Sequence, residues 1–231
     1  MLDATAHKLV SSQKVHREMR TSLEAVSTLI EPNISAIKLG EALHLHRISK
    51  GAELDWSQDH QRQAVLAGTD TRTGDSNSLS SMLKDIPVVS INIQCSLTNT
   101  KLARTISLQD GLPSRSSRLV ELNFTHNFTE QLRQKFLAQA KPELSVAALN
   151  TTFQQNIATA GFEYLAKRPL IEGYRQLGSH TIVKAEPEIT LADCLFFSLN
   201  LHIGIVGGQY GVHWADSYCI NNAGHLSLFG I

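Results

Sequence analysis

The chain has 231 residues, of which 42% are hydrophobic and 18% charged, with 21 basic and 21 acidic side chains. This composition is typical of a folded globular protein, with a somewhat low content of charged residues. The balanced charge, without a basic run, argues against a dedicated nucleic-acid binder.

The sequence contains no targeting or membrane signal. The first twenty residues carry mixed charges without a continuous apolar core, and no apolar run approaches the roughly eighteen residues that span a bilayer. The three cysteines, Cys95, Cys194 and Cys219, have no metal-site spacing and suit a reducing compartment. We therefore predict a soluble cytoplasmic protein that does not associate with a membrane.

Residues 1–66 are predicted to form an N-terminal helix followed by a strand pair or a second helix. Val15, Met19 and Leu23 recur at four-residue steps, which indicates an amphipathic helix from about residue 4 to residue 30. Residues 34–49 suit a strand pair that turns at Gly40, and they also suit a helix; we favour strands. Residues 67–81 are predicted to be a flexible loop because of their composition.

Residues 82–231 are predicted to form an antiparallel sheet with a two-helix insertion, within a single domain overall. Apolar and polar residues alternate in 89–97, 102–108 and 118–124, which predicts a meander of three strands. Asn127 is predicted to cap a helix to residue 140, and a second helix follows from 142 to 164. A strand is expected near 180–185, and we detect no internal repeat.

Residues 198–215 alternate strictly and are interrupted by Gly207 and Gly208. Glycine accepts the positive φ of a two-residue hairpin turn, so this pattern predicts two paired strands in preference to a buried helix. The register puts His202 directly opposite His213 on the polar face. The predicted fold class is α+β: an antiparallel β-sheet, made of a meander plus a C-terminal hairpin, with helices packed on its apolar face.

The polar face of this sheet has few charged residues and many amides, hydroxyls and imidazoles. Such groups both donate and accept hydrogen bonds, which suits a pocket for a small polar ligand. A structural role is the alternative, in which these groups satisfy one another against another layer or subunit. The residues predicted to bind the ligand are Asn92, Gln94, Asn123 and Asn200.

His202 and His213 are the predicted catalytic groups, with Glu121 as an assisting carboxylate. Imidazole titrates near neutral pH, so the pair suits acid/base chemistry. Two histidines without a third ligand do not make a metal site, so no metal is assigned, and no cofactor is identified. Whether the chain is an enzyme stays open, as do lyase, isomerase and hydrolase chemistry.

Three functions remain to be separated. The first is an α+β protein that binds a small molecule; if it is an enzyme, it uses histidine acid/base chemistry on a polar organic ligand. The second is a non-catalytic subunit or interaction module of a larger assembly, which contacts another protein subunit or a second copy of the chain. The third is a nucleic-acid-contacting subunit, which the neutral net charge disfavours.

Overall fold

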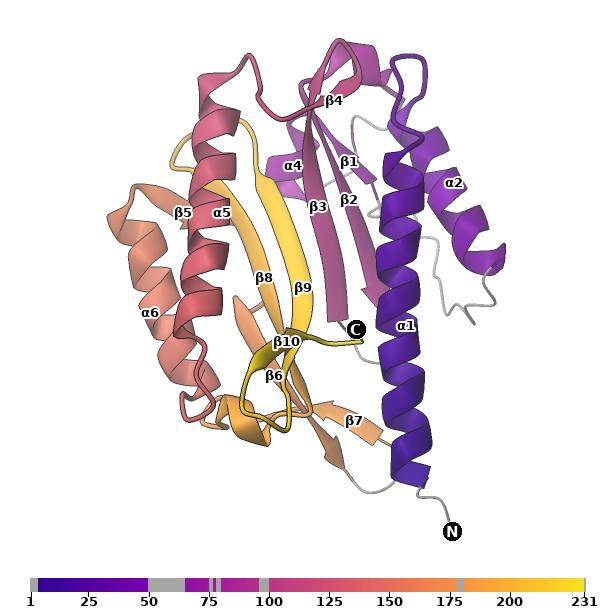
Figure 1. The fold of residues 1–231 in the computed structure, drawn as a ribbon. Helices are drawn as coiled ribbons and strands as arrows, with labels where there is room; N and C mark the ends of the chain where they lie inside the picture. Colours follow the sequence, from indigo (N-terminus) through magenta and orange to yellow (C-terminus); the bar gives the residue numbers. More distant parts are fainter. Residues whose placement is uncertain are drawn as a thin grey trace.

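A computed structural model describes residues 4–49, 65–74, 77, 80–95, 100–177 and 181–230. The described strands form one curled antiparallel sheet in the order β1-β2-β3-β9-β8-β6-β7, with β4 paired to β3, β5 to β8 and β10 to β9 (Figure 1). The strands are β1 Val65–Ala67, β2 Val88–Cys95, β3 Thr100–Gln109, β4 Leu112–Ser114, β5 Phe162–Tyr164, β6 Ile171–Leu177, β7 Thr181–Lys184, β8 Phe196–Ile205, β9 Val212–Ile220 and β10 Leu226–Leu228.

Helices cover the apolar face of the sheet, which confirms the predicted α+β class. In the first half, Ile91 of β2 is buried in one core cluster with Met19 of α1, and in the second half Leu201 of β8 is buried in another with Phe136 of α5. No described helix is both long and apolar enough to cross a membrane. The helices are α1 Ala4–Ser27, α2 Ala36–Ser49, α4 Asp70–Thr73, α5 Val120–Gln139 and α6 Val146–Thr159, with 3₁₀ turns η1 Leu83–Asp85 and η2 Leu191–Asp193.

The two halves of the chain repeat one arrangement, so the prediction of no internal repeat is wrong. Each half begins with a pair of long helices, α1 and α2 or α5 and α6, and later has a 3₁₀ turn that leads into a long central strand, β2 or β8. The backbone N–H of Leu83 donates to the carbonyl of Ile34 at 2.9 Å, and that of Leu191 donates to Leu144 at 3.0 Å. The recurring residues are sparse, as in Pro-x-x-Ser at 32–35 and 142–145 and Leu-x-Asp-x-x-x-x-Ser-x-Asn at 83–92 and 191–200, which explains why the repeat is hard to see in the sequence.

Residues 36–49 form helix α2 and not the favoured strand pair. Leu39 and Leu43, four residues apart, are fully buried against α1 and the sheet. Ile37 and Leu45 are 44% and 65% exposed. Together with Leu39 and Leu43, these two exposed apolar residues imitate the alternation of a strand. The helix buries only the residues that recur at four-residue steps on one of its faces.

Helix α5 replaces the predicted third strand of the meander. It begins at Val120, so Asn127 lies inside the helix and does not cap it. Its buried residues follow helical spacing through Leu122 and Leu132, whereas Val120 and Phe124 are 67% and 61% exposed. The predicted second helix is α6, which ends at Thr159, and residues 162–164 form strand β5 instead.

The C-terminal hairpin has the predicted register. Strands β8 and β9 pair Leu201 with Trp214 and His202 with His213. The turn is wider than predicted, because residues 206–211 all lie outside the two strands. Gly207, with a φ of 72°, lies in the left-handed region that favours glycine.

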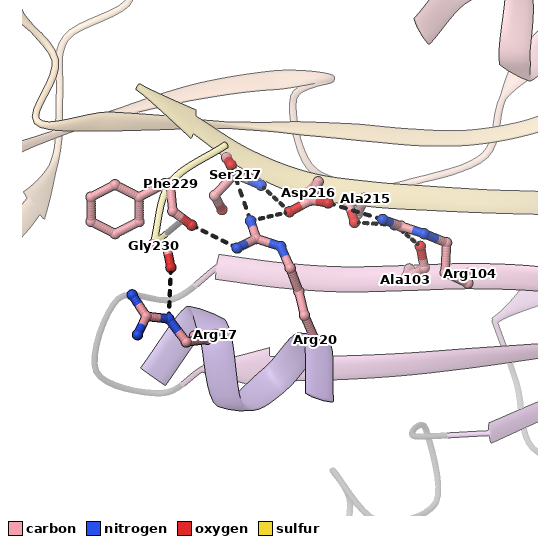
Figure 2. Close-up of polar contacts among 9 residues, drawn as sticks. All are labelled: Arg17, Arg20, Ala103, Arg104, Ala215, Asp216, Ser217, Phe229 and Gly230. Atoms are coloured by element: carbon pink, nitrogen blue, oxygen red, sulfur yellow. Dashed lines mark hydrogen bonds and ion pairs between the residues drawn. The ribbon is translucent and has the colours of Figure 1, made fainter. Parts of the chain in front are cut away.

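Asp216 joins the two halves of the sheet on its helical side. In the described structure β3 and β9 pair directly over only two residues each. The nearly fully buried carboxylate of Asp216 accepts hydrogen bonds from Arg20 of α1 at 2.6 Å and Arg104 of β3 at 2.9 Å (Figure 2). Arg20 also donates to the carbonyl of Phe229 at 2.8 Å, which attaches the C-terminal segment to α1.

Candidate functional site

His202 and His213 lie face to face at the centre of the polar side of the sheet. Their ring centroids are 4.8 Å apart and the ring planes differ by 22°. Their exposed fractions are 6% and 3%. The two imidazoles therefore form a stacked and nearly water-free pair.

Both imidazoles donate from Nε2. His202 Nε2 lies 2.6 Å from the carbonyl oxygen of Thr71, which can only accept. His213 Nε2 lies 2.6 Å from Oδ1 of Asn200, whose amide nitrogen donates to the Tyr164 hydroxyl at 3.1 Å. Burial lowers the pKa of His202 to about 4 and holds the pKa of His213 well below its usual value. Both rings are neutral at pH 7.

Helix α4 covers one end of the polar face next to the histidines. It lies inside the segment predicted to be a flexible loop, of which residues 75, 76, 78 and 79 fall outside the described structure. The Thr71 hydroxyl accepts a hydrogen bond from the N–H of Gly211 at 3.2 Å. A Cβ on Gly211 would lie 2.5 Å from the Thr71 carbonyl oxygen and 3.0 Å from His202 Nε2. Glycine at 211 therefore allows α4 to approach and fix the His202 ring.

The central row of the polar face contains two amides and two alanines. Asn92 pairs with Ala103, Ala103 with Ala215, and Ala215 with Asn200, across strands β2, β3, β9 and β8. Asn92 and Asn200 are equivalent in the two halves, since each follows the leucine of its 3₁₀ turn by nine residues. Within the described residues no group of three or more His, Cys, Asp or Glu side chains is placed to hold a metal ion.

A cavity of about 250 Å³ opens beside these residues. Its described walls include three cations and no carboxylate: Lys101 comes from β3, and Lys167 and Arg168 come from the segment between β5 and β6. The half-buried ammonium of Lys101 has no ion pair in the described structure, and burial together with the charge of Arg168 lowers its pKa. The residues lining the cavity are Leu66, Thr73, Gly74, Asn92, Lys101, Leu165, Ala166, Lys167, Arg168, Asn200, His202 and His213.

Only part of the predicted ligand-binding set meets at this cavity. Asn92 and Asn200 line it. Gln94 is not a lining residue, although it pairs with Lys101 in the β2–β3 ladder. Asn123 lies on α5, where its side chain exchanges two hydrogen bonds of 2.7 Å with the backbone of Ser117. The expectation that Asn123 lies on the polar sheet face is therefore wrong.

Glu121 also lies on α5 and not on a strand beside the histidines. Its Oε1 accepts hydrogen bonds from the backbone N–H groups of Gln209 at 2.7 Å and Tyr210 at 2.9 Å. This contact fixes the connection between β8 and β9. The expected placement of Glu121 is wrong because residues 118–124 are not a strand.

The sequence interpretation missed Lys101, Arg168 and Thr71. Lys101 lies between the predicted strands 89–97 and 102–108, Arg168 follows the predicted second helix, and Thr71 lies in the predicted flexible loop. No local motif marks them. The repeat would have been the useful signal, because it aligns Asn92 with Asn200 and thereby identifies the centre of the face.

Comparison with known proteins identifies the fold of the chain but no family. No protein-family model matches the sequence, and no curated protein matches it. Among solved structures, X-Pro aminopeptidase from Thermotoga maritima matches 95% of this chain and 59% of its own, with a TM-score of 0.68 and 15% identity. Prolidase from Pyrococcus horikoshii matches 95% and 60%, with a TM-score of 0.64 and 13% identity.

A third solved structure, Xaa-Pro dipeptidase from Bacillus anthracis, matches 94% of this chain and 59% of its own, with a TM-score of 0.63 and 15% identity. The chain thus spans about three fifths of the length of these proteins. At these identities the likeness concerns the fold. The chain has the fold of a domain that occurs in X-Pro aminopeptidases and Xaa-Pro dipeptidases.

Proposed function

We propose that this chain binds a small organic anion, and specifically the free carboxylate of a short peptide, in the cavity on the polar face of the sheet. The observation that carries the proposal is the half-buried ammonium of Lys101, which has no ion pair in the described structure and lies in a wall that includes Lys167 and Arg168 but no carboxylate. A partly desolvated cation without a carboxylate partner, as Lys101 is in the described structure, favours an anion that supplies the missing counter-charge.

The peptide class comes from the fold comparison. The solved proteins of similar fold are named for X-Pro and Xaa-Pro peptides. A dipeptide that ends in proline offers one carboxylate for the cations and one amide carbonyl for neutral donors. Asn92 and Asn200 are the neutral polar groups of the cavity wall that are suited to that carbonyl.

We assign the two histidines to the wall of the cavity and not to proton transfer. Both Nε2 atoms already donate to protein acceptors, and burial keeps the pKa of each ring below neutral pH. A general acid or base is most effective when its pKa lies near the working pH. The catalytic alternative makes a distinct prediction: hydrolysis of a Xaa-Pro dipeptide that disappears in His213→Gln.

Thermal unfolding with paired probes tests the proposal. Glycyl-proline should raise the melting temperature in a concentration-dependent manner, and its C-terminal amide should not, because only the acid carries the anion. Lys101→Gln should remove the response, whereas Lys141→Gln, an exposed lysine between α5 and α6, should retain it. Equal stabilisation by the acid and the amide would contradict the proposal.

The stability of Lys101→Gln separates binding from a structural role. The lysine has no ion pair in the described structure, so its replacement removes an uncompensated charge. We expect the unliganded variant to be at least as stable as the parent protein, as is typical of residues kept for function at a cost in stability. A variant that loses both binding and stability would indicate a structural lysine instead.

A further inference from the structure

A second cavity lies where strands β3 and β9 separate. Beyond the two residue pairs that join β3 and β9 directly, the side chain of Thr105 links the strands. Its hydroxyl accepts a hydrogen bond from the backbone N–H of His213 at 2.7 Å and donates one to the backbone carbonyl of His213 at 3.2 Å. Further along, β3 pairs with β4 at Ser107. A cavity of about 350 Å³ opens at this change of partner and is also bounded by α5. His213 borders both this cavity and the first one.

Two buried polar atoms of the residues lining this second cavity have no hydrogen-bond partner in the described structure. They are Oγ of Ser107, on β3, and Nε2 of His126, on α5. Burial lowers the pKa of His126, so its ring is neutral at pH 7 and Nε2 can either donate or accept. Buried polar groups are normally hydrogen-bonded, so both atoms have hydrogen-bonding capacity left over next to the cavity.

The remaining walls define the charge and polarity of that partner. Arg115 is exposed at the rim and has no ion pair among the described residues, whereas Glu130 is already neutralised by two hydrogen bonds from Arg133 at 2.7 and 2.8 Å. The unbalanced charge is therefore positive. The apolar part of the wall consists of Ile106, Val212 and Trp214.

We propose that this second cavity is a binding site for a small carboxylic acid with an aromatic or other compact apolar body. Arg115 binds the carboxylate at the rim, and Ile106, Val212 and Trp214 pack against the apolar body. Ser107 and His126 complete their hydrogen bonding with polar atoms of the ligand. The volume of about 350 Å³ accommodates a compact acid of this kind. This site is separate from the proposed peptide-carboxylate cavity.

Tryptophan fluorescence provides a local readout of this site. The chain has two tryptophans, so a Trp56→Phe background leaves Trp214 as the single reporter. Titration with phenylacetate should change its fluorescence with saturation, and phenylacetamide, which lacks the negative charge, should bind at least about tenfold more weakly. Equal affinity for acid and amide, or no saturable change up to about 10 mM, would overturn the proposal.

Three variants distinguish the two cavities. Arg115→Gln should weaken phenylacetate binding about tenfold, the size expected for one charge-assisted contact. Arg118→Gln, a nearby exposed arginine that pairs with Asp110, should bind like the background protein. Lys101→Gln should also bind normally. Loss of binding in Lys101→Gln with retention in Arg115→Gln would assign phenylacetate to the first cavity and refute the second site.

Discussion

Acidification from pH 7 to pH 5 should destabilise this fold through its buried histidines. Burial lowers the pKa of His16 and of His202 to about 4 each, whereas a histidine in an unfolded chain titrates near 6.5. The unfolded chain therefore binds more protons over this interval. The contribution to stability is complete above pH 6.5 and is lost as the pH falls toward 4.

The size of the loss follows from the two pKa values. One pKa unit corresponds to about 1.4 kcal/mol, so each histidine costs about 2 kcal/mol between pH 7 and pH 5. His16 and His202 together cost about 4 kcal/mol, and His213 adds to the loss with the same sign. This is a large fraction of the 5–15 kcal/mol that stabilises a typical domain.

Urea unfolding followed by circular dichroism at pH 7 and pH 5 measures this effect. His16 contacts the rings of Phe196 and Phe229 with centroid distances of 5.6 and 5.1 Å, so His16→Leu keeps an apolar side chain there. This variant should lose about 2 kcal/mol less than the parent protein on acidification. His225→Gln, at an exposed turn, is the matched control and should behave like the parent. Equal losses in His16→Leu and the parent would refute the reasoning.

Three further substitutions test individual contacts. Asp216→Asn leaves Arg20 and Arg104 without their carboxylate and should cost about 3–5 kcal/mol in urea unfolding, whereas Asp110→Asn, at an exposed ion pair, should cost less than about 1 kcal/mol. Gly211→Ala forces a Cβ against the Thr71 carbonyl and should cost about 1–3 kcal/mol in the same assay; an unchanged midpoint would contradict the packing of α4. Glu121→Ala removes the acceptor of two backbone amides, so hydrogen exchange at Gln209 and Tyr210 should accelerate. Exchange within β8 should stay unchanged. Slow exchange at both amides in the variant would show that other groups hold the loop.

The sequence carries enough information for the hairpin of β8 and β9. Alternation over 198–205 is long and strict, and a one-residue slip would bury His202 among the apolar residues, so the register follows from the pattern. The same rule fails at 118–124 and 34–49, where exposed apolar residues such as Phe124 and Leu45 imitate strand alternation on helices. Which apolar residues are buried decides between the two-residue period of a strand and the helical spacing. A single sequence does not show which residues are buried.

The candidate site was predictable only in part for a similar reason. The histidine pair depends on one hairpin and follows from local pattern alone. The cavity depends on contacts between segments far apart in the chain, because Lys101 and Arg168 approach the sheet centre from different halves. Thr71 approaches His202 through a one-turn helix inside a stretch that resembles a loop. Such tertiary positions leave no periodic signal.

Isothermal titration of glycyl-proline into the parent protein, Lys101→Gln and Lys141→Gln tests the central claim most directly. Anion capture by the partly desolvated Lys101 predicts saturable binding to the parent and to Lys141→Gln, with affinity that falls as salt is added. It predicts a loss of at least about tenfold in Lys101→Gln, the expected weight of one charge-assisted hydrogen bond. Salt-independent binding of equal strength to all three proteins would contradict a cationic ligand site on the polar face of the sheet.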